Sequence, residues 1–176
     1  STSSATPSHT PTMTKTTTSA TPTQSPEDLA IAAAKARIPE YNAMADSSLK
    51  DTKAFSIESF KKVAIGTALD DLNNRFSAVS AQGYTQTGDS VIESMTNPRV
   101  DLKLDLKKSP PDVPTVQLDV CLDVSKVNLI DAAGKSVIPA DRKPRQLWRV
   151  GVSNYDYPNP SRWLVSFTDT QGGKTC

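Results

Sequence analysis

The two cysteines are the side chains whose type and position indicate most about the chemistry of this chain. Cys121 lies inside an alternating apolar run, residues 116–123, and Cys176 is the last residue of the sequence. Because chain ends usually fray, a thiol at the end acquires a structural role if it bonds to Cys121 and ties the terminus to the core. Disulfides persist outside the reducing cytosol. The pair therefore predicts a disulfide between Cys121 and Cys176 and an extracytoplasmic location.

Catalytic chemistry is restricted by the single histidine, His9, which lies outside the part of the chain expected to fold. Residues 25–176 offer no imidazole for acid–base catalysis, for a Ser-His-Asp triad or for a histidine-containing zinc site. With both thiols oxidised, they also offer no cysteine nucleophile and no thiolate ligand. The sequence has no Gly-rich phosphate loop, nucleotide fingerprint or metal-binding motif. We therefore expect a protein that is not an enzyme, with no catalytic residues, no metal and no cofactor.

Asp119 and Asp123 are carboxylates that alternate with Cys121 and so share one face of a strand. One interpretation is a hard-cation site or an acid pair. The other, which we favour because acids are rarely fully buried, is that this is the solvent face, so that the C-terminus must wrap around the sheet edge to reach Cys121. The core face of the strand then consists of Val116, Leu118, Val120 and Leu122.

Trp148 and Trp163 are the candidate pocket or core residues. Both could line an internal pocket and stack on a flat ligand, because an indole presents a large apolar face. Aromatic side chains of small domains more often belong to the core, and we favour the core for both.

The chain divides into two parts of different composition. Among residues 1–24, fifteen are Ser or Thr, three are Pro, and none is Leu, Ile, Val, Phe, Trp or Tyr. Such a segment cannot bury enough apolar surface to offset the entropy of ordering, so we expect a disordered tether over residues 1–24 and one domain over residues 25–176.

A Ser/Thr/Pro tether is typical of bacterial surface proteins held by a lipid. We expect such an anchor before Ser1, with a plain secreted protein as the alternative.

Charge and hydropathy indicate whether a nucleic acid or a membrane is an expected partner. The chain has 20 Lys and Arg against 19 Asp and Glu, whereas nucleic-acid binders usually carry a basic surplus. We therefore expect no nucleic-acid partner. No apolar run approaches the roughly 18 residues that a membrane span needs, so we expect contact with a membrane only through the lipid anchor.

Helices are expected at the start of the domain. Ser25 can cap a helix whose first position is Pro26. The missing amide of Pro39 should kink or break this helix, which gives either one bent helix or two short ones. A second apolar stripe at helical spacing covers residues 56–81, where Gly66 allows a turn between two helices.

Strands are expected after residue 83, where apolar and polar residues alternate. Trp163, Val165 and Phe167 should share one face of the last strand. Short polar links indicate an antiparallel meander, and helices followed by strands predict an α+β fold with the helices on one face of the sheet. The expected strands are a weak one over residues 84–95, then 100–107, 115–123, 127–130, 146–152 and 162–168.

Several local motifs occur in a characteristic order: CLDVS at 121–125, DAAGK at 131–135, WRV at 148–150, RWLV at 162–165 and the terminal Cys176. Over roughly residues 26–176 the chain resembles the NTF2-like (cystatin-like) fold, and its motifs are similar to those of extracellular NTF2-like domains of actinobacterial lipoproteins. The resemblance implies N-terminal helices packed across the concave face of a strongly curved antiparallel sheet, which together form a cone. In some relatives the cone holds a ligand or active site, and in others side chains fill it.

These observations favour a non-enzymatic, surface-tethered extracellular binding domain of a lipoprotein, whose partner is a protein or a cell-envelope component. One alternative is a small-ligand-binding or enzymatic domain that uses the cone cavity. Another is a phage- or plasmid-borne surface exclusion protein. A deep, polar-floored cavity that contains a buried carboxylate with a raised pKa favours the first alternative. A packed interior with an exposed apolar patch on the sheet favours the envelope-binding domain.

Overall fold

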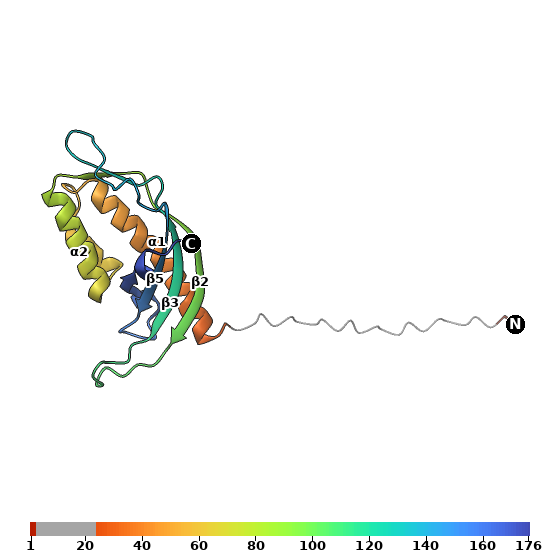
Figure 1. Ribbon diagram of the computed structural model, residues 1–176. Helices are drawn as coiled ribbons and strands as arrows, with labels where there is room; N and C mark the ends of the chain where they lie inside the picture. Colours follow the sequence, from red (N-terminus) through yellow and green to blue (C-terminus); the bar gives the residue numbers. More distant parts are fainter. Residues whose placement is uncertain (3–23) are drawn as a thin grey trace.

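The computed structural model describes residues 1–2 and 24–176 of the chain. The tether expected over residues 1–24 therefore lies almost entirely outside the described residues. Helices come first and strands follow (Figure 1). The helical elements are α1 (Pro26–Lys50), the 3-10 helix η1 (Ile57–Lys62), α2 (Gly66–Ala81), and two later 3-10 helices, η2 (Pro160–Arg162) and η3 (Gln171–Gly173). The strands are β1 (Thr85–Thr87), β2 (Val91–Asp101), β3 (Thr115–Asp123), β4 (Asn128–Ile130), β5 (Arg145–Ser153) and β6 (Leu164–Asp169).

The main sheet is antiparallel, with the strand order β2-β3-β5-β6. Both long helices lie on the same side of this curved sheet (Figure 1), which confirms the predicted α+β class. The meander is interrupted, because β4 leaves the main sheet and pairs with β1 in a separate two-stranded sheet. None of the helices described is both long and apolar enough to cross a bilayer.

Helix α1 begins with a capping box. The Ser25 Oγ accepts a hydrogen bond from the Asp28 backbone N–H at 3.1 Å, and the Asp28 carboxylate accepts one from the Ser25 N–H at 3.3 Å. The helix then continues through Pro39, so the expected break and the two-helix alternative are wrong. Pro39 and Lys35, whose carbonyl loses its intrahelical donor, lie on the exposed side of the helix, where water can satisfy that carbonyl.

The second helical region is divided at Gly66, as one of the two interpretations predicted. Gly66 adopts a φ of +60° and opens α2, a conformation that costs other residues more than glycine. The segment just before it is held against β6. The Val165 carbonyl accepts from the Ile65 N–H at 2.8 Å, and the Val165 N–H donates to the Val63 carbonyl at 2.9 Å. These bonds position α2 over the sheet.

The strand expected over residues 100–107 is wrong over most of its length, because β2 ends at Asp101. Asp101 pairs with Thr115, the first residue of β3, so the ladder has no further partner beyond this point. Only an isolated bridge between Asp105 and Asp112 continues the pairing. The alternating leucines that suggested a strand instead protrude on a loop, where Leu104 is 44% exposed and Leu106 is 54% exposed.

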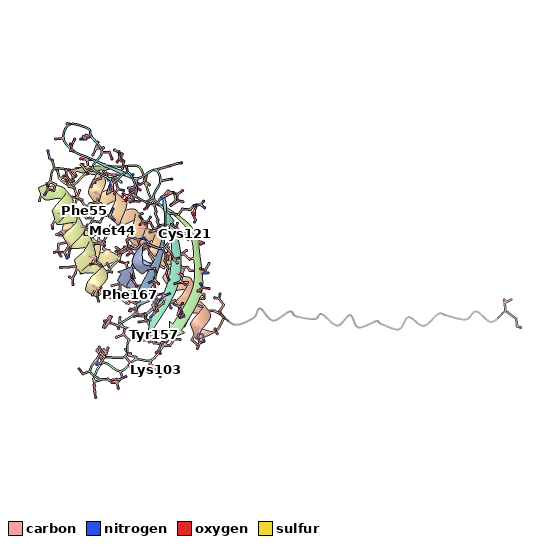
Figure 2. The ribbon with its side chains drawn as sticks, viewed as in Figure 1. Met44, Phe55, Lys103, Cys121, Tyr157 and Phe167 are labelled. Atoms are coloured by element: carbon pink, nitrogen blue, oxygen red, sulfur yellow. A yellow bond between two sulfur atoms is a disulfide. The ribbon has the colours of Figure 1, made fainter. Side chains whose placement is uncertain are left out.

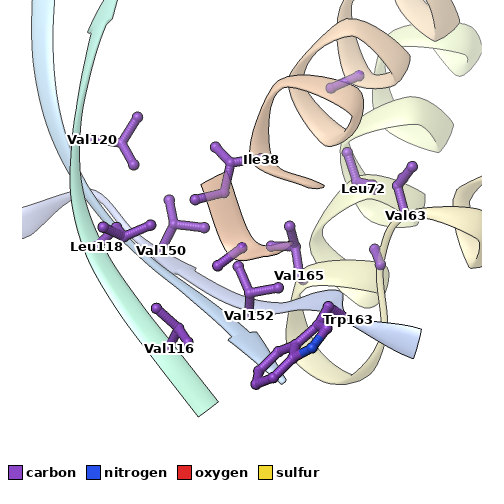
Figure 3. Close-up of a cluster of buried hydrophobic side chains, with 14 of the residues drawn as sticks. Ile38, Val63, Leu72, Val116, Leu118, Val120, Val150, Val152, Trp163 and Val165 are labelled. Carbon is purple, nitrogen blue, oxygen red and sulfur yellow. The ribbon is translucent and has the colours of Figure 1, made fainter. Parts of the chain in front are cut away.

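The core fills one end of the space between the helices and the sheet. Val116 pairs with Val152, and Leu118 pairs with Val150 on the neighbouring strand, with all four side chains turned toward the helices and buried (Figure 3). Trp163 closes this end of the cluster and is 3% exposed. The helical side contributes Ala30, Ala34, Ile38, Phe60, Val63, Ala68 and Leu72.

Phe167 faces away from the core, contrary to the expectation that it shares a face with Val165. Val165 pairs with Val152, whereas Phe167 pairs with Gly151, because the register shifts by one residue between these two pairs. Neighbouring residues of β5 point to opposite faces of the sheet. The ring of Phe167 therefore covers Gly151 on the outer face, where a Cβ atom at Gly151 would lie 2.0 Å from the ring.

The predicted disulfide between Cys121 and Cys176 is present, with the two Cα atoms 5.8 Å apart. Cys121 lies on the outer face of β3 (Figure 2), because its neighbour Val120 belongs to the core. After η3 the chain runs beside the start of β5, where the Lys174 carbonyl accepts from the Leu147 N–H at 3.0 Å. The terminus then reaches Cys121 on the side of the sheet away from the helices (Figure 1).

Candidate functional site

A cavity of about 650 Å³ occupies the other end of the space between the helices and the sheet. The inward-facing pairs of β3 and β5 continue into it, first Val120 with Trp148 and then Leu122 with Gln146. Burial decreases in this direction, since Val120 is fully buried while Leu122, Trp148 and Gln146 are only half-buried. The same sheet face is therefore covered by core packing at one end and lines a cavity at the other.

The structure separates the two tryptophans. Trp163 belongs to the buried core, where its ring lies edge-on to Tyr157 with centroids 6.2 Å apart. Trp148 is half-buried and forms part of the cavity wall. Its Nε1 donates to the Gln146 Oε1 at 3.1 Å, so its polar edge is satisfied while its indole contributes an apolar surface to the wall.

Asp46 is a buried carboxylate of α1 at the cavity margin, and both of its oxygens are hydrogen-bonded. Its Oδ1 accepts from the Gln86 Nε2 at 2.7 Å, and its Oδ2 accepts from the Ser90 backbone N–H at 2.9 Å and the Ser90 Oγ at 2.7 Å. These bonds tie the end of α1 to β1 and to the start of β2. Asp46 therefore supports the wall, and its lone pairs are committed to protein donors.

Tyr41 lies on the α1 side of the cavity, half-buried among the core residues. Burial raises the pKa of its phenol to about 12, and the charge of Asp71 adds to the increase while the Thr168 side chain and Arg75 oppose it. The phenol consequently stays protonated at neutral pH. It can donate or accept a hydrogen bond from a bound molecule, but it does not supply a base.

Arg75 of α2 and Arg142 of the loop before β5 are the cations that line the cavity. Burial lowers the pKa of the Arg75 guanidinium, the charge of Asp46 opposes that change, and the charge of Arg142 adds to it. The side chain as a whole is nevertheless exposed. The effect of burial on the pKa and the exposure of the side chain are compatible if the exposed part of Arg75 faces the cavity. An arginine stays charged at neutral pH even so.

Arg142 is anchored by the backbone around it. Its Nη2 donates to the Val124 carbonyl at 2.8 Å and to the Val127 carbonyl at 2.6 Å. These bonds fix the guanidinium against the segment that follows β3. The described residues that line the cavity include no cysteine and no histidine.

Asp119 and Asp123 occupy the opposite, outer face of the sheet. Asp119 is 8% exposed, so the expectation of a solvated carboxylate is wrong for this residue. Its Oδ2 accepts from the Asn97 Nδ2 at 3.0 Å and its Oδ1 from the Arg149 Nε at 3.1 Å. Arg99 lies 3.7 Å away and also covers it.

The two carboxylates do not form a joint site. Asp123 accepts from the Ser125 backbone N–H at 2.8 Å and so terminates β3 locally. The hydrogen bonds to Ser125 lower its pKa. Within residues 1–2 and 24–176, no group of three or more His, Cys, Asp or Glu side chains is arranged to hold a metal ion.

Replacing Asp119 with asparagine is expected to remove a pH-dependent part of the stability. The hydrogen bond from Asn97, followed by the bond and charge of Arg149, holds the pKa of the Asp119 carboxyl below its usual value of 3.8, although burial opposes this. Since the folded-state pKa is the lower one, the carboxylate stabilises the fold above pH 3.8, and this contribution disappears as the pH falls through the folded-state pKa.

At neutral pH, D119N should lower the free energy of unfolding by about 1 kcal/mol, since solvent screens the partly exposed arginines. The difference should shrink as the pH falls below 3.8 and the carboxyl becomes protonated. Urea unfolding at neutral and acid pH measures it, and the exposed Asp141→Asn serves as the control. Equal stability of D119N and the parent at neutral pH would contradict the assignment.

Arg75, Tyr41, Asp46 and Arg142 were not identified from the sequence. A signal for Arg75 exists, because it lies three residues after Leu72 and four before Val79 and so interrupts the apolar stripe of α2. A cation in that stripe is a candidate for a functional side chain. The other three carry no local pattern that distinguishes them from ordinary polar residues.

No protein-family model matches the sequence, and no curated protein matches it. Among solved structures, the chain is similar to the crystal structure of the intermembrane space region of the chloroplast protein ARC6. The two share 13% sequence identity, the match covers 80% of this chain and 94% of that chain, and the TM-score is 0.47. A similarity this distant supports no inference about function, so the site is interpreted from its own residues.

Proposed function

We propose that this chain is a non-enzymatic, extracytoplasmic binding domain that holds a small, largely apolar molecule in the cavity between its helices and its sheet. The cavity carries the proposal. Its volume of about 650 Å³ lies within the range of known small-molecule sites, which are mostly apolar with a few placed polar groups. The Cys121–Cys176 disulfide supports a location outside the reducing cytosol.

The composition of the wall supports an apolar ligand. Side chains from two sheet strands, from α1 and from the loop before β5 present apolar surface to one space: Ile38, Leu122, Ile138, Trp148 and Val150. Removing apolar surface from water yields about 25 cal/mol for each Å². A ligand that covers this wall gains affinity without the need for a charged partner.

The polar groups of the cavity support binding over catalysis. The Tyr41 phenol, with its pKa raised to about 12, is a poor base at neutral pH. Both oxygens of Asp46 already accept hydrogen bonds from Gln86 and Ser90. We also propose that the Ser/Thr/Pro-rich N-terminal segment attaches the domain to a cell envelope. The proposed family is that of the NTF2-like lipoprotein domains.

Phenylnaphthylamine, an uncharged fluorescent probe of apolar pockets, tests the function. We expect saturable binding with one site per chain. Trp148→Ala removes part of the wall and should weaken binding by about tenfold, which corresponds to the loss of one buried aromatic contact. Leu104→Ser is the matched control, because Leu104 is an exposed apolar side chain outside the cavity. Absence of saturable binding, or equal losses in both variants, would contradict the proposal.

A further inference from the structure

Among the described residues, Arg75 and Arg162 are the arginines with neither an ion pair nor a side-chain hydrogen bond, and of these two Arg75 lines the cavity. Arg37 pairs with Glu40, Arg145 with Glu93, and Arg149 with Asp119. In the part of the chain that the structure describes, no carboxylate lies within 4.0 Å of the Arg75 guanidinium, and no hydrogen bond from it is formed. The Arg75 side chain is exposed and lines the cavity, so its N–H groups are available to a bound molecule.

The charges around Arg75 leave a place for an anion. Three carboxylates line the cavity together with the two arginines: Asp46, Asp71 and Asp169. Both oxygens of Asp169 accept hydrogen bonds from Gln171, at 3.1 and 2.6 Å, and Asp71, one turn before Arg75 on α2, is exposed. Asp46 already shares its charge with three donors from Gln86 and Ser90. Two guanidinium groups, those of Arg75 and Arg142, therefore line the same cavity and repel each other. A negative group between them would relieve that repulsion.

The apolar wall and the two cations belong to one cavity. Trp148 and Leu122 come from the sheet, Arg75 from α2 and Arg142 from the loop before β5. Arg142 is fixed by the carbonyls of Val124 and Val127, so its guanidinium is oriented before any ligand arrives. Carboxylate and sulfonate groups match the planar fork of a guanidinium.

We infer that the ligand of this cavity is an anionic amphiphile, with its carboxylate or sulfate-like head between Arg75 and Arg142 and its apolar body against Trp148. The inference rests on the proposed binding function and adds the chemical class of the ligand. It also assigns a specificity role to Arg75, because the apolar wall by itself does not distinguish a charged amphiphile from a neutral one.

Two fluorescent probes with the same aromatic body test the inference. Anilinonaphthalene sulfonate carries a negative charge, and phenylnaphthylamine does not. In Arg75→Gln, we expect the affinity for the sulfonate to fall by at least about tenfold, while the affinity for the neutral probe stays within about twofold. Arg75→Lys keeps the charge and should retain part of the sulfonate affinity. Arg99→Gln, on the outer face of the sheet, is the matched control and should change neither.

A displacement measurement extends the test to aliphatic molecules. Decanoate should displace phenylnaphthylamine from the parent protein at a lower concentration than decanol, and the two should become equal in Arg75→Gln. Thermal unfolding of each variant checks that the fold is intact. Equal losses of both probes in Arg75→Gln would overturn the inference and leave the binding function standing. Failure of both probes to bind the parent protein would instead overturn the binding function itself.

Discussion

Removal of the Cys121–Cys176 bond is expected to lower the free energy of unfolding by about 4 kcal/mol. The bond closes a loop over a sequence separation of 55 residues, so its loss restores much conformational freedom to the unfolded chain. Urea unfolding of the oxidised protein and of the Cys121→Ala, Cys176→Ala double variant measures the difference. Alanine is preferred to serine at position 121, because that side chain is buried and a hydroxyl there would need a partner.

Two further measurements make this expectation specific. Thiol titration of the native protein should detect no reactive group, and titration after reduction should detect both cysteines. Cys176→Ala alone should be about as destabilising as the double variant, because either change opens the same loop. Two reactive thiols in the native protein would contradict the bond and would weaken the argument for an extracytoplasmic location.

Trp163→Ala is expected to cost about 3–5 kcal/mol of folding free energy. The indole is 3% exposed and closes the end of the core, so its removal leaves a cavity that the surrounding side chains fill only in part. The half-buried Trp148 is the matched comparison, and Trp148→Ala should cost only about 1–2 kcal/mol. Urea unfolding of both variants under the same conditions gives the two values.

The comparison also separates stability from binding. Trp148→Ala should lose probe affinity at a temperature where it remains folded, whereas Trp163→Phe, which keeps an aromatic ring in the core, should bind the probe as the parent does. If Trp148→Ala proved the more destabilising of the two alanine variants, the division of the sheet face into a core end and a cavity end would be wrong.

The features that the sequence predicted well are those set by local periodicity. Residues 115–123 alternate strictly, and β3 occupies that range with Val116, Leu118 and Val120 buried. The disulfide was also predictable, because Cys121 on the outer face and a terminal Cys176 can be joined by the chain end wrapping around the sheet. In both cases the pattern depends on side chains that are close in sequence or covalently bonded.

The errors arose where distant packing decides the outcome. Pro39 does not break α1, and it lies with Lys35 on the exposed side of the helix, where water can satisfy the freed carbonyl. The leucines at 104 and 106 have a strand-like spacing but no neighbouring strand. Phe167 changes face because β6 shifts register against β5. The local alternation of residue types does not indicate solvent exposure of a helix side, the presence of a neighbouring strand or a register shift.

The cavity could not be predicted for a related reason. Tyr41, Arg75 and Arg142 come from α1, α2 and a loop, and only the folded arrangement brings them to one space. The sequence indicated that Trp148 and Trp163 were equivalent candidates, yet one lies in the core and the other in the cavity wall. The two tryptophans differ because one end of the sheet face is covered by core packing and the other lines a cavity. The alternation of residues within a single strand does not indicate which end a residue occupies.

The division of one sheet face into two ends also has an evolutionary consequence. Substitutions near Val116 and Val152 act on the packed core and are expected to be selected against for their effect on folding. Substitutions near Leu122 and Gln146 border an open space, so under the proposed binding function they would alter ligand preference at little cost to folding. Proteins that share this fold and the proposed binding function should therefore differ in what they bind while they retain the same packed end. New specificities would then arise by single substitutions at the cavity end.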